Sequence, residues 1–150
     1  NVVDRLIEHH ELQAPGGRVR AGANSWMLSA DMAHGVHPNY ADMHEPNHKP
    51  MLGGGPVLKS HVEHRYASEA ETMARFRAAC AAVDVPCQEF VNRTDLACGS
   101  TVGPMIASDL GVPTADIGMA MLSMHSIREQ SGTADVEQMI AVLKHVFEQG

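Results

Sequence analysis

One stretch of the chain concentrates side chains that can bind a metal ion. Residues 29–48, SADMAHGVHPNYADMHEPNH, hold four histidines and two aspartates, and Pro38 and Pro46 keep the stretch from forming one helix. Asp31 directly follows an apolar run, where a stiff strand would hold a metal-binding or catalytic carboxylate. An aspartate at such a position can equally form a turn or a helix cap. The residues alone leave both interpretations open.

The histidines of this stretch differ in what their neighbours indicate. His34 and His37 are three residues apart and close to Asp31, which favours a site over two solvated side chains. His44 and His48 stand further along among polar residues, so we expect them on the surface.

Two further segments carry groups that could complete a site. Residues 94–104, TDLACGSTVGP, form a Gly-Ser-Thr turn before a helix, where free backbone N–H groups can hold a carboxylate or an oxyanion. A simple N-cap by Ser100 is the alternative. Residues 123–129, SMHSIRE, place His125 after an apolar run, where it would be either a zinc ligand or a hydrogen-bonded core histidine. A Cys98 nucleophile with His125 as its base finds no support in the spacing.

These segments need strands and helices to position them. Apolar periodicity and turn residues predict an alternation of the two, which indicates an α/β fold with a mixed or largely parallel sheet and helices on both faces. Ligands bind such sheets where strands end, so we expect Asp31, Ser100 and His125 to approach one another at one edge. The expected strands are 25–30, 57–60, 88–93 and 114–119, the expected helices are 1–10, 68–83, 100–110 and one starting at 133 or 135, and a Gly-rich loop is expected at 14–23.

Local signals support several of these boundaries. Ser68 and Glu71 have the spacing of a capping box, and Gly111 is placed to end the third helix. The last helix has an apolar stripe that we expect to be buried. Its members are Val136, Met139, Ile140, Leu143, Val146 and Phe147.

Composition excludes several classes of protein. The chain has 150 residues, of which 44% are hydrophobic and 19% charged, as is usual for a globular domain. A net charge of −7 argues against nucleic acid or an anionic membrane as a partner. No apolar run reaches the roughly 20 residues of a membrane span, and the first residues lack the features of a signal peptide, so we expect a cytoplasmic protein. Three cysteines without a CxxC motif indicate reduced thiols.

The chain as a whole resembles one known family. It carries, in this order, the motifs SADMAHGVHPNY, HEPNHKPML, GPVLK, RYAS, CGSTVGP and MHSIRE. From about Ser25 to the end it is similar to the C-terminal part of the aspartyl aminopeptidases, a family of dinuclear zinc exopeptidases. The resemblance implies that residues 1–150 are the C-terminal part of a zinc-peptidase catalytic domain, whose upstream segment and dimerisation domain would be absent. It also implies two zinc ions, a homo-oligomeric full-length enzyme, and a peptide substrate with an acidic first residue.

Residue by residue, the resemblance implies specific roles. Asp31 in SADMAH matches a ligand of one zinc ion, and His125 in MHSIRE matches a ligand of the other. His37 is assigned to packing or support of the pocket. The residues that match the family's substrate-binding positions are His34, Lys59, Tyr66, Gly99 and Ser100.

The implied chemistry is metal-assisted hydrolysis, in which two zinc ions activate a water and a glutamate takes its proton. An acidic substrate side chain would be met by Lys59, assisted by His34. In the family the general base belongs to a Glu-Glu pair upstream of the matched region, and this chain has no such pair. No catalytic residue is therefore assigned here, and we expect the isolated chain to be inactive. A non-catalytic fragment or binding module that keeps half of the site is the alternative.

Overall fold

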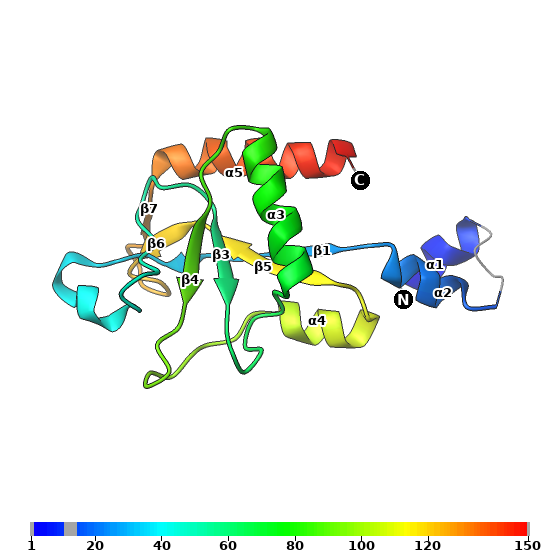
Figure 1. Cartoon of the computed structure of the whole chain (residues 1–150), viewed down its shortest axis with the longest axis horizontal. Coiled ribbons are helices and arrows are strands. Elements are labelled where there is room, and N and C mark those ends of the chain that lie inside the picture. Colours follow the sequence, from blue (N-terminus) through cyan, green and yellow to red (C-terminus); the bar gives the residue numbers. More distant parts are fainter. Residues whose placement is uncertain (1, 11–14, 150) are drawn as a thin grey trace.

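Helices and strands are interspersed along the chain, and between residues 57 and 118 they alternate one by one (Figure 1). The computed structural model describes residues 2–10 and 15–149. In chain order the elements are α1 (Val2–His9), α2 (Gly17–Ala23), β1 (Met27–Ala30), β2 (Ala33–His34), the 3-10 helix η1 (Pro38–Met43), β3 (Val57–Ser60), α3 (Ala70–Ala82), β4 (Gln88–Val91), α4 (Gly103–Leu110), β5 (Thr114–Gly118), β6 (Ala120–Leu122), β7 (Gln130–Ser131) and α5 (Thr133–Gln149).

The strands form two small sheets. The sheets are joined by a two-stranded ribbon, in which β1 continues into β2 and the neighbouring β5 continues into β6. The four-stranded sheet has the order β1-β5-β3-β4, in which β1 is parallel to β5, β3 is parallel to β4, and β3 is antiparallel to β5. The second sheet has the order β2-β6-β7. The predicted α/β class with a mixed sheet is confirmed. Because β3 and β4 run opposite to β1 and β5, the two pairs end at opposite edges.

The ribbon bends where β1 passes into β2 and β5 into β6. Asp31 still donates its backbone N–H to Ile117 O (3.0 Å), and Ala33 donates to Met119 O (2.9 Å), so the pairing continues through the bend. A Cβ atom on Gly118 would lie 1.9 Å from the Asp31 carbonyl oxygen. Only glycine permits the two backbone segments to approach each other so closely.

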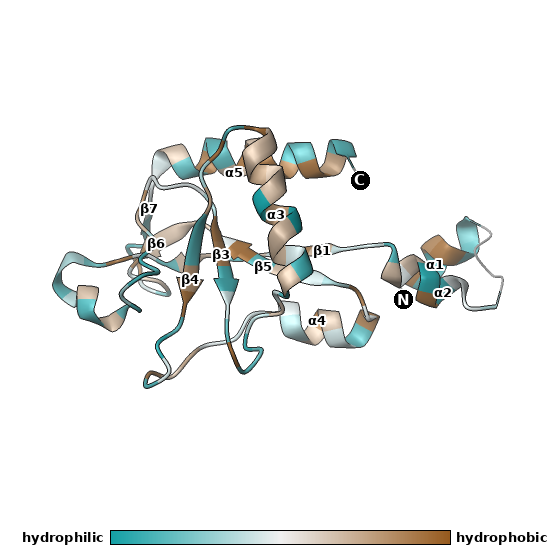
Figure 2. Cartoon of the chain, in the orientation of Figure 1, coloured by the Kyte–Doolittle hydropathy of each residue, from teal (hydrophilic) through white to brown (hydrophobic). Residues whose placement is uncertain are grey.

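The two faces of the four-stranded sheet have different partners. Helices α3 and α5 pack on one face, where Phe76, Met139 and Val142 join Leu58 and Ile117 in the main apolar core. Figure 2 shows apolar residues on β5 and on the first half of β3. Neighbouring residues of the strands point to the opposite face, which carries the polar groups of the candidate site and the start of α4.

The predicted loop at 14–23 is wrong over residues 17–23, which form α2. Gly16, with a φ of 77°, ends the preceding turn and lies before the helix. The helix begins at Gly17, and Gly22 is its second-to-last residue, so both glycines lie in the end turns and the penalty for glycine in a helix interior does not apply in full. Residues 1 and 14, which our predictions also included, lie outside the described part.

The start of α3 differs from the predicted capping box. Glu69 is the N-cap, and Glu69 and Thr72 form the box in place of Ser68 and Glu71. The Ser68 hydroxyl is engaged elsewhere, because it accepts a hydrogen bond from the backbone N–H of Asp116 (2.8 Å). By contrast, strand 57–60 is confirmed, and Gly111 ends α4 with a φ of 66° as predicted.

The predicted apolar stripe of α5 is only partly buried. Met139 is buried, whereas Ile140 is 60% and Phe147 83% exposed. The buried face includes Val142, which the prediction left out, and two predicted members, Leu143 and Val146, are partly buried against the same core. None of the helices in the described ranges is both long and apolar enough to cross a membrane.

Candidate functional site

Asp31 lies at the bend of the ribbon. Its side chain is exposed, and its Oδ1 accepts a hydrogen bond from the backbone N–H of Met32 (2.7 Å). The backbone carbonyls of the same two residues face Lys59, whose Nζ lies 3.5 Å from Asp31 O and 3.4 Å from Met32 O. The bend thus presents a carboxylate outward while its carbonyl oxygens hold a buried ammonium.

Lys59 is a buried cation, with a residue exposure of 1%. Burial lowers its pKa below the usual value for lysine, and the carboxylates of Asp116 and Asp31 act in the opposite direction. The ammonium also lies 5.3 Å from the centre of the Tyr66 ring, within range of a cation–π interaction. Its hydrogen bonds to carbonyl oxygens are long, so the ammonium retains the capacity to bind an anion.

Tyr66 connects Lys59 to an aromatic cluster. Its ring is buried and meets the Phe90 ring edge-on, with 6.2 Å between ring centres. Burial raises the pKa of the phenol, and a hydrogen bond with Cys98 adds to the effect. Tyr66 therefore stays neutral and brings the segment around Cys98 next to Lys59.

Asp116, in the middle of β5, is fully buried and ties the site loops together. Its carboxylate accepts hydrogen bonds from the backbone N–H of Ala67 (2.5 Å) and the Thr101 hydroxyl (2.7 Å). A Cβ atom on Gly103 would lie 2.5 Å from its Oδ2, so α4 begins directly against the carboxylate. Our sequence reasoning missed this residue. The signal was an aspartate inside an apolar strand, which must be hydrogen-bonded or paired when buried.

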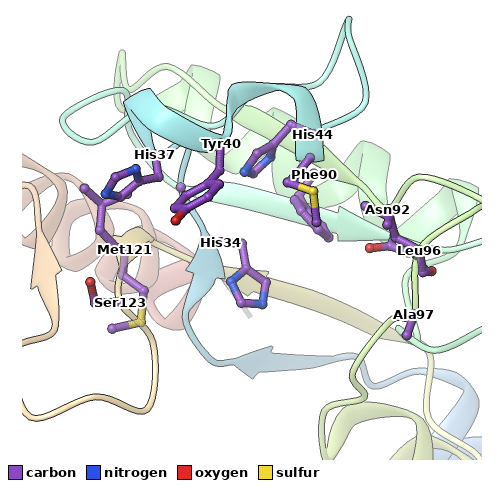
Figure 3. Close-up of a pocket in the computed structure, with 13 residues that line it drawn as sticks. His34, His37, Tyr40, His44, Phe90, Asn92, Leu96, Ala97, Met121 and Ser123 are labelled. Carbon is purple, nitrogen blue, oxygen red and sulfur yellow. Dashed lines mark hydrogen bonds between the residues drawn. The ribbon is translucent and has the colours of Figure 1, made fainter.

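His34 faces a cavity of about 610 Å³ beside this cluster (Figure 3). Burial lowers the pKa of its imidazole, and the neighbouring His125 and Lys59 lower it further. The neutral ring, which can accept a hydrogen bond or bind a metal ion, is therefore favoured. The other lining residues are Gly35, His37, Tyr40, Met43, His44, Phe90, Asn92, Leu96, Ala97, Met121, Leu122 and Ser123.

The remaining histidines of the 29–48 stretch have structural partners. The Nδ1 atom of His37 accepts the backbone N–H of Asn39 (3.1 Å) and thereby caps η1. The predicted surface position of His44 is wrong, because its ring packs edge-on against Phe90, with 6.1 Å between centres, and lines the cavity. His48 is half-buried, and its Nδ1 lies 2.5 Å from Glu45 Oε2.

His125 lies in an exposed turn between β6 and β7. Its φ of 66° is in the left-handed region, and its backbone N–H donates to Glu129 Oε1 (2.6 Å). The side chain is exposed, so the core-histidine alternative is wrong. Its electrostatic effect on His34 places the two imidazoles in the same neighbourhood.

Gly99 and Ser100 are exposed and precede α4. The Ser100 hydroxyl donates to Arg65 O (3.2 Å) and lies 3.3 Å from Thr101 O. The alternative of an N-cap by Ser100 is wrong, because Val102 occupies the N-cap position. The turn instead joins the 61–68 segment to the loop before α4.

The site segments meet over a face of the sheet, which differs from the expected single edge. Residues 92–102 leave from the end of β4, at the edge opposite to Asp31, because β4 runs opposite to β1. They reach the centre of the sheet, where Lys59 interacts electrostatically with Asp31, Asp116 and Cys98. Lys59 is thus the point at which the separate segments converge.

Asp31 and His125 carry the donor types that zinc prefers, namely a carboxylate oxygen and an imidazole nitrogen. A zinc site in proteins usually has three or four protein ligands. Within residues 2–10 and 15–149, no group of three His, Cys, Asp or Glu side chains could hold a metal ion. The donors fit zinc in kind, but by themselves they are too few to form a complete site.

Comparisons with known proteins match the chain over nearly its whole length. Residues 1–147 match the model of the family described as aminopeptidase I zinc metalloprotease (M18). A probable M18 family aminopeptidase 2 from Ectopseudomonas mendocina is 54% identical over 125 residues, which are 83% of this chain and 29% of that protein. The chain therefore spans less than a third of that relative.

Solved structures match the fold as well. A chain in the cryo-EM structure of the Ape4 and Nbr1 complex is 37% identical, with a TM-score of 0.88 over 91% of this chain and 26% of that one. A chain of the S. cerevisiae mApe1 dodecamer is 27% identical, with a TM-score of 0.78 over 97% of this chain and 33% of that one.

Proposed function

The chain belongs to the M18 family of aminopeptidase I zinc metalloproteases, and from this premise we propose that it supplies one part of the active site of an aminopeptidase that removes N-terminal Asp or Glu from peptides. The observation that carries the proposal is the convergence of Asp31, His34 and Tyr66 on Lys59. The chain would form the C-terminal part of the catalytic domain, as the motif resemblance implies, and it spans 29% of the E. mendocina relative.

Asp31 and His125 would each bind one of two zinc ions, and the remaining ligands and the general base would come from other parts of the full-length polypeptide. Bound zinc polarises the scissile carbonyl and lowers the pKa of a water molecule. Two features of the chain support the assignment of these donors. Both side chains are exposed, and the bend that carries Asp31 is held by backbone pairing on both sides.

The substrate would lie along the cavity beside His34. Gly99 and Ser100 would contact the peptide backbone. Tyr66, whose high pKa keeps it neutral, would support the site from behind Phe90, which lines the cavity. An acidic first side chain would be attracted to Lys59, whose burial strengthens electrostatic interactions. Lys59 does not line the cavity, so the acidic group would reach its ammonium from beside His34.

This assignment predicts a change in specificity in a full-length polypeptide that contains this chain. Lys59→Met should lower kcat/KM for Asp- and Glu-peptides by about 100-fold, because an acidic group bound without its counter-charge is strongly disfavoured. Neutral peptides should lose less than about tenfold. The measurement is kcat/KM on matched Asp and Ala peptides. Lys144→Met, which removes an exposed lysine on α5, is the control. Equal losses on both substrates would assign Lys59 a structural role instead.

The isolated chain should be inactive on Asp-peptides and should retain no stoichiometric zinc after dialysis. One ligand to each ion gives weak binding, because catalytic zinc sites use about three protein ligands. The checks are metal analysis of the dialysed protein and a peptide-hydrolysis assay, each with and without the upstream segment of an M18 relative added in trans. Chelator-sensitive hydrolysis by the chain alone would contradict the prediction and would point to Glu45, Glu63 or Glu129 as the base.

We also propose that the full-length protein is a cytoplasmic homo-oligomer with no nucleic-acid or membrane partner. The similar mApe1 protein of S. cerevisiae was solved as a dodecamer, which supports the oligomer. The net charge of −7 supports the absence of a polyanionic partner.

A further inference from the structure

Two cysteine side chains meet where α3 ends and β4 begins, away from the candidate site. Cys80 lies in the last turn of α3, and Cys87 directly precedes β4. The chain reverses between them in a tight turn, in which Val83 N–H and Val85 N–H both donate to Cys80 O (3.2 and 3.0 Å) and Asp84 has a φ of 55°. This turn packs Cys87 against the buried core cluster that contains Cys80, so the two thiols come together.

The two thiols differ in their access to solvent. Cys80 is 1% exposed and belongs to the main core with Phe76 and Ala79. Cys87 is half-buried at the edge of that core, and its Sγ also lies 3.6 Å from Gln88 O. A small oxidant can therefore reach Cys87 but not Cys80.

The charges around the pair also distinguish the two thiols. The hydrogen bond from Cys80 lowers the pKa of Cys87, and the Arg77 guanidinium lowers it further, against the opposing effects of burial and of Glu89. Glu89 is itself paired with Arg77 (2.5 Å). The hydrogen bond with Cys87 and burial raise the pKa of Cys80. Of the two thiols, Cys87 therefore loses its proton more readily, and Cys80 stays protonated.

We propose that Cys80 and Cys87 are a peroxide-oxidised site that forms an intramolecular disulfide between α3 and β4. The Cys87 thiolate attacks one oxygen of hydrogen peroxide, the O–O bond breaks, and hydroxide leaves, which gives a sulfenic acid on Cys87. The Cys80 sulfur then loses its proton and attacks the Cys87 sulfur, and the S–O bond breaks as water leaves. Two thiols lose two electrons in all, and the peroxide is reduced to two waters. An added dithiol reduces the disulfide back to two thiols and is itself oxidised to a disulfide.

The disulfide would fix the start of β4 to α3. Strand β4 lies at the end of the four-stranded sheet and carries Phe90, which lines the cavity beside His34. The oxidation state of the pair therefore acts on a strand that supports the candidate site. The proposal itself does not depend on aminopeptidase activity, so it can fail or succeed independently of the proposed function.

The chain allows a direct test by peptide mapping. Cleavage after Arg77 and Arg93 releases residues 78–93, which contain both cysteines, whereas Cys98 lies in a different peptide. After treatment of the folded chain with hydrogen peroxide and alkylation, we expect this peptide to lose two hydrogen atoms and to remain unalkylated. Reduction with dithiothreitol should restore both alkylation sites.

Three variants distinguish the steps. Cys98→Ser, the matched control, should form the disulfide as the unchanged chain does. Cys80→Ser should accumulate a sulfenic acid on Cys87, detected with a 1,3-diketone probe, and Cys80→Ala serves the same purpose if the serine disturbs the core. Cys87→Ser should slow the peroxide reaction of Cys80 by at least about tenfold. A reduced 78–93 peptide under conditions that oxidise Cys98, or a Cys87 sulfinic acid without any disulfide in the unchanged chain, would overturn the proposal.

Discussion

Asp116→Ala should lower the free energy of unfolding by about 4 kcal/mol, which is among the largest effects expected for one substitution. The carboxylate accepts hydrogen bonds from Ala67 N–H and the Thr101 hydroxyl, and it is the strongest carboxylate influence on the buried Lys59. Its removal leaves these donors without a partner and deprives a buried ammonium of a counter-charge. Urea denaturation of the folded chain measures the change.

Two further substitutions make this result specific. Asp109→Ala removes an exposed aspartate from the neighbouring helix α4 and should change stability by less than about 0.5 kcal/mol. Asp116→Asn keeps the size of the side chain and one carbonyl acceptor, so its loss of stability should lie between those of Asp116→Ala and Asp109→Ala. If Asp116→Ala were as stable as Asp109→Ala, the carboxylate would not hold the loops together.

Asp135→Ala should cost about 3 kcal/mol, because a buried carboxylate with two backbone donors contributes more than a neutral hydrogen bond. Asp135 lies in the first turn of α5 and is fully buried. It accepts the N–H groups of Gly53 (2.8 Å) and Gly55 (2.9 Å), in the turn that leads into β3. The substitution should also expose these two amides to hydrogen exchange, which NMR detects residue by residue.

The control for Asp135 is Glu137→Ala, which removes an exposed acidic residue from the same helix. We expect little change in stability and no change in exchange at Gly53 or Gly55. Loss of protection in both variants would show that the acidic charge of the helix matters more than the two hydrogen bonds. Retained protection in Asp135→Ala would show that the turn is held by other contacts.

Periodicity predicted the fold where one local signal dominated. Strand 57–60 begins with two buried apolar residues, Val57 and Leu58, and lies inside the sheet between β5 and β4, so pattern and packing agree. The prediction was wrong where a distant group competed. Ser68 was predicted as a helix cap, but Asp116, which is 48 residues away in sequence, uses its hydroxyl. The antiparallel direction of β3 relative to β5 could not be predicted from local sequence patterns either, because it depends on how the connections cross the sheet.

The candidate site was predicted in part, and mostly through motif resemblance. The histidines and Asp31 were visible as polar residues in a loop, and Lys59 was predicted from the motif resemblance alone. Asp116, an aspartate within an apolar strand, was overlooked. The roles of Lys59 and Asp116 depend on the pairing of β3 with β5 and on the loops that contain Ala67 and Thr101. His44 was misplaced because its packing partner, Phe90, is 46 residues away in sequence.

The close approach at Gly118 has a consequence for how the ribbon can vary. If β5 slipped by one residue against β1, Ile117 or Met119 would occupy the place of Gly118, and its Cβ would collide with the Asp31 carbonyl. The absence of a side chain at position 118 therefore selects one register of β5 against β1 and excludes registers shifted by one residue. Asp31, whose carbonyl oxygen makes this contact, is therefore fixed at one position along β5, and its carboxylate with it.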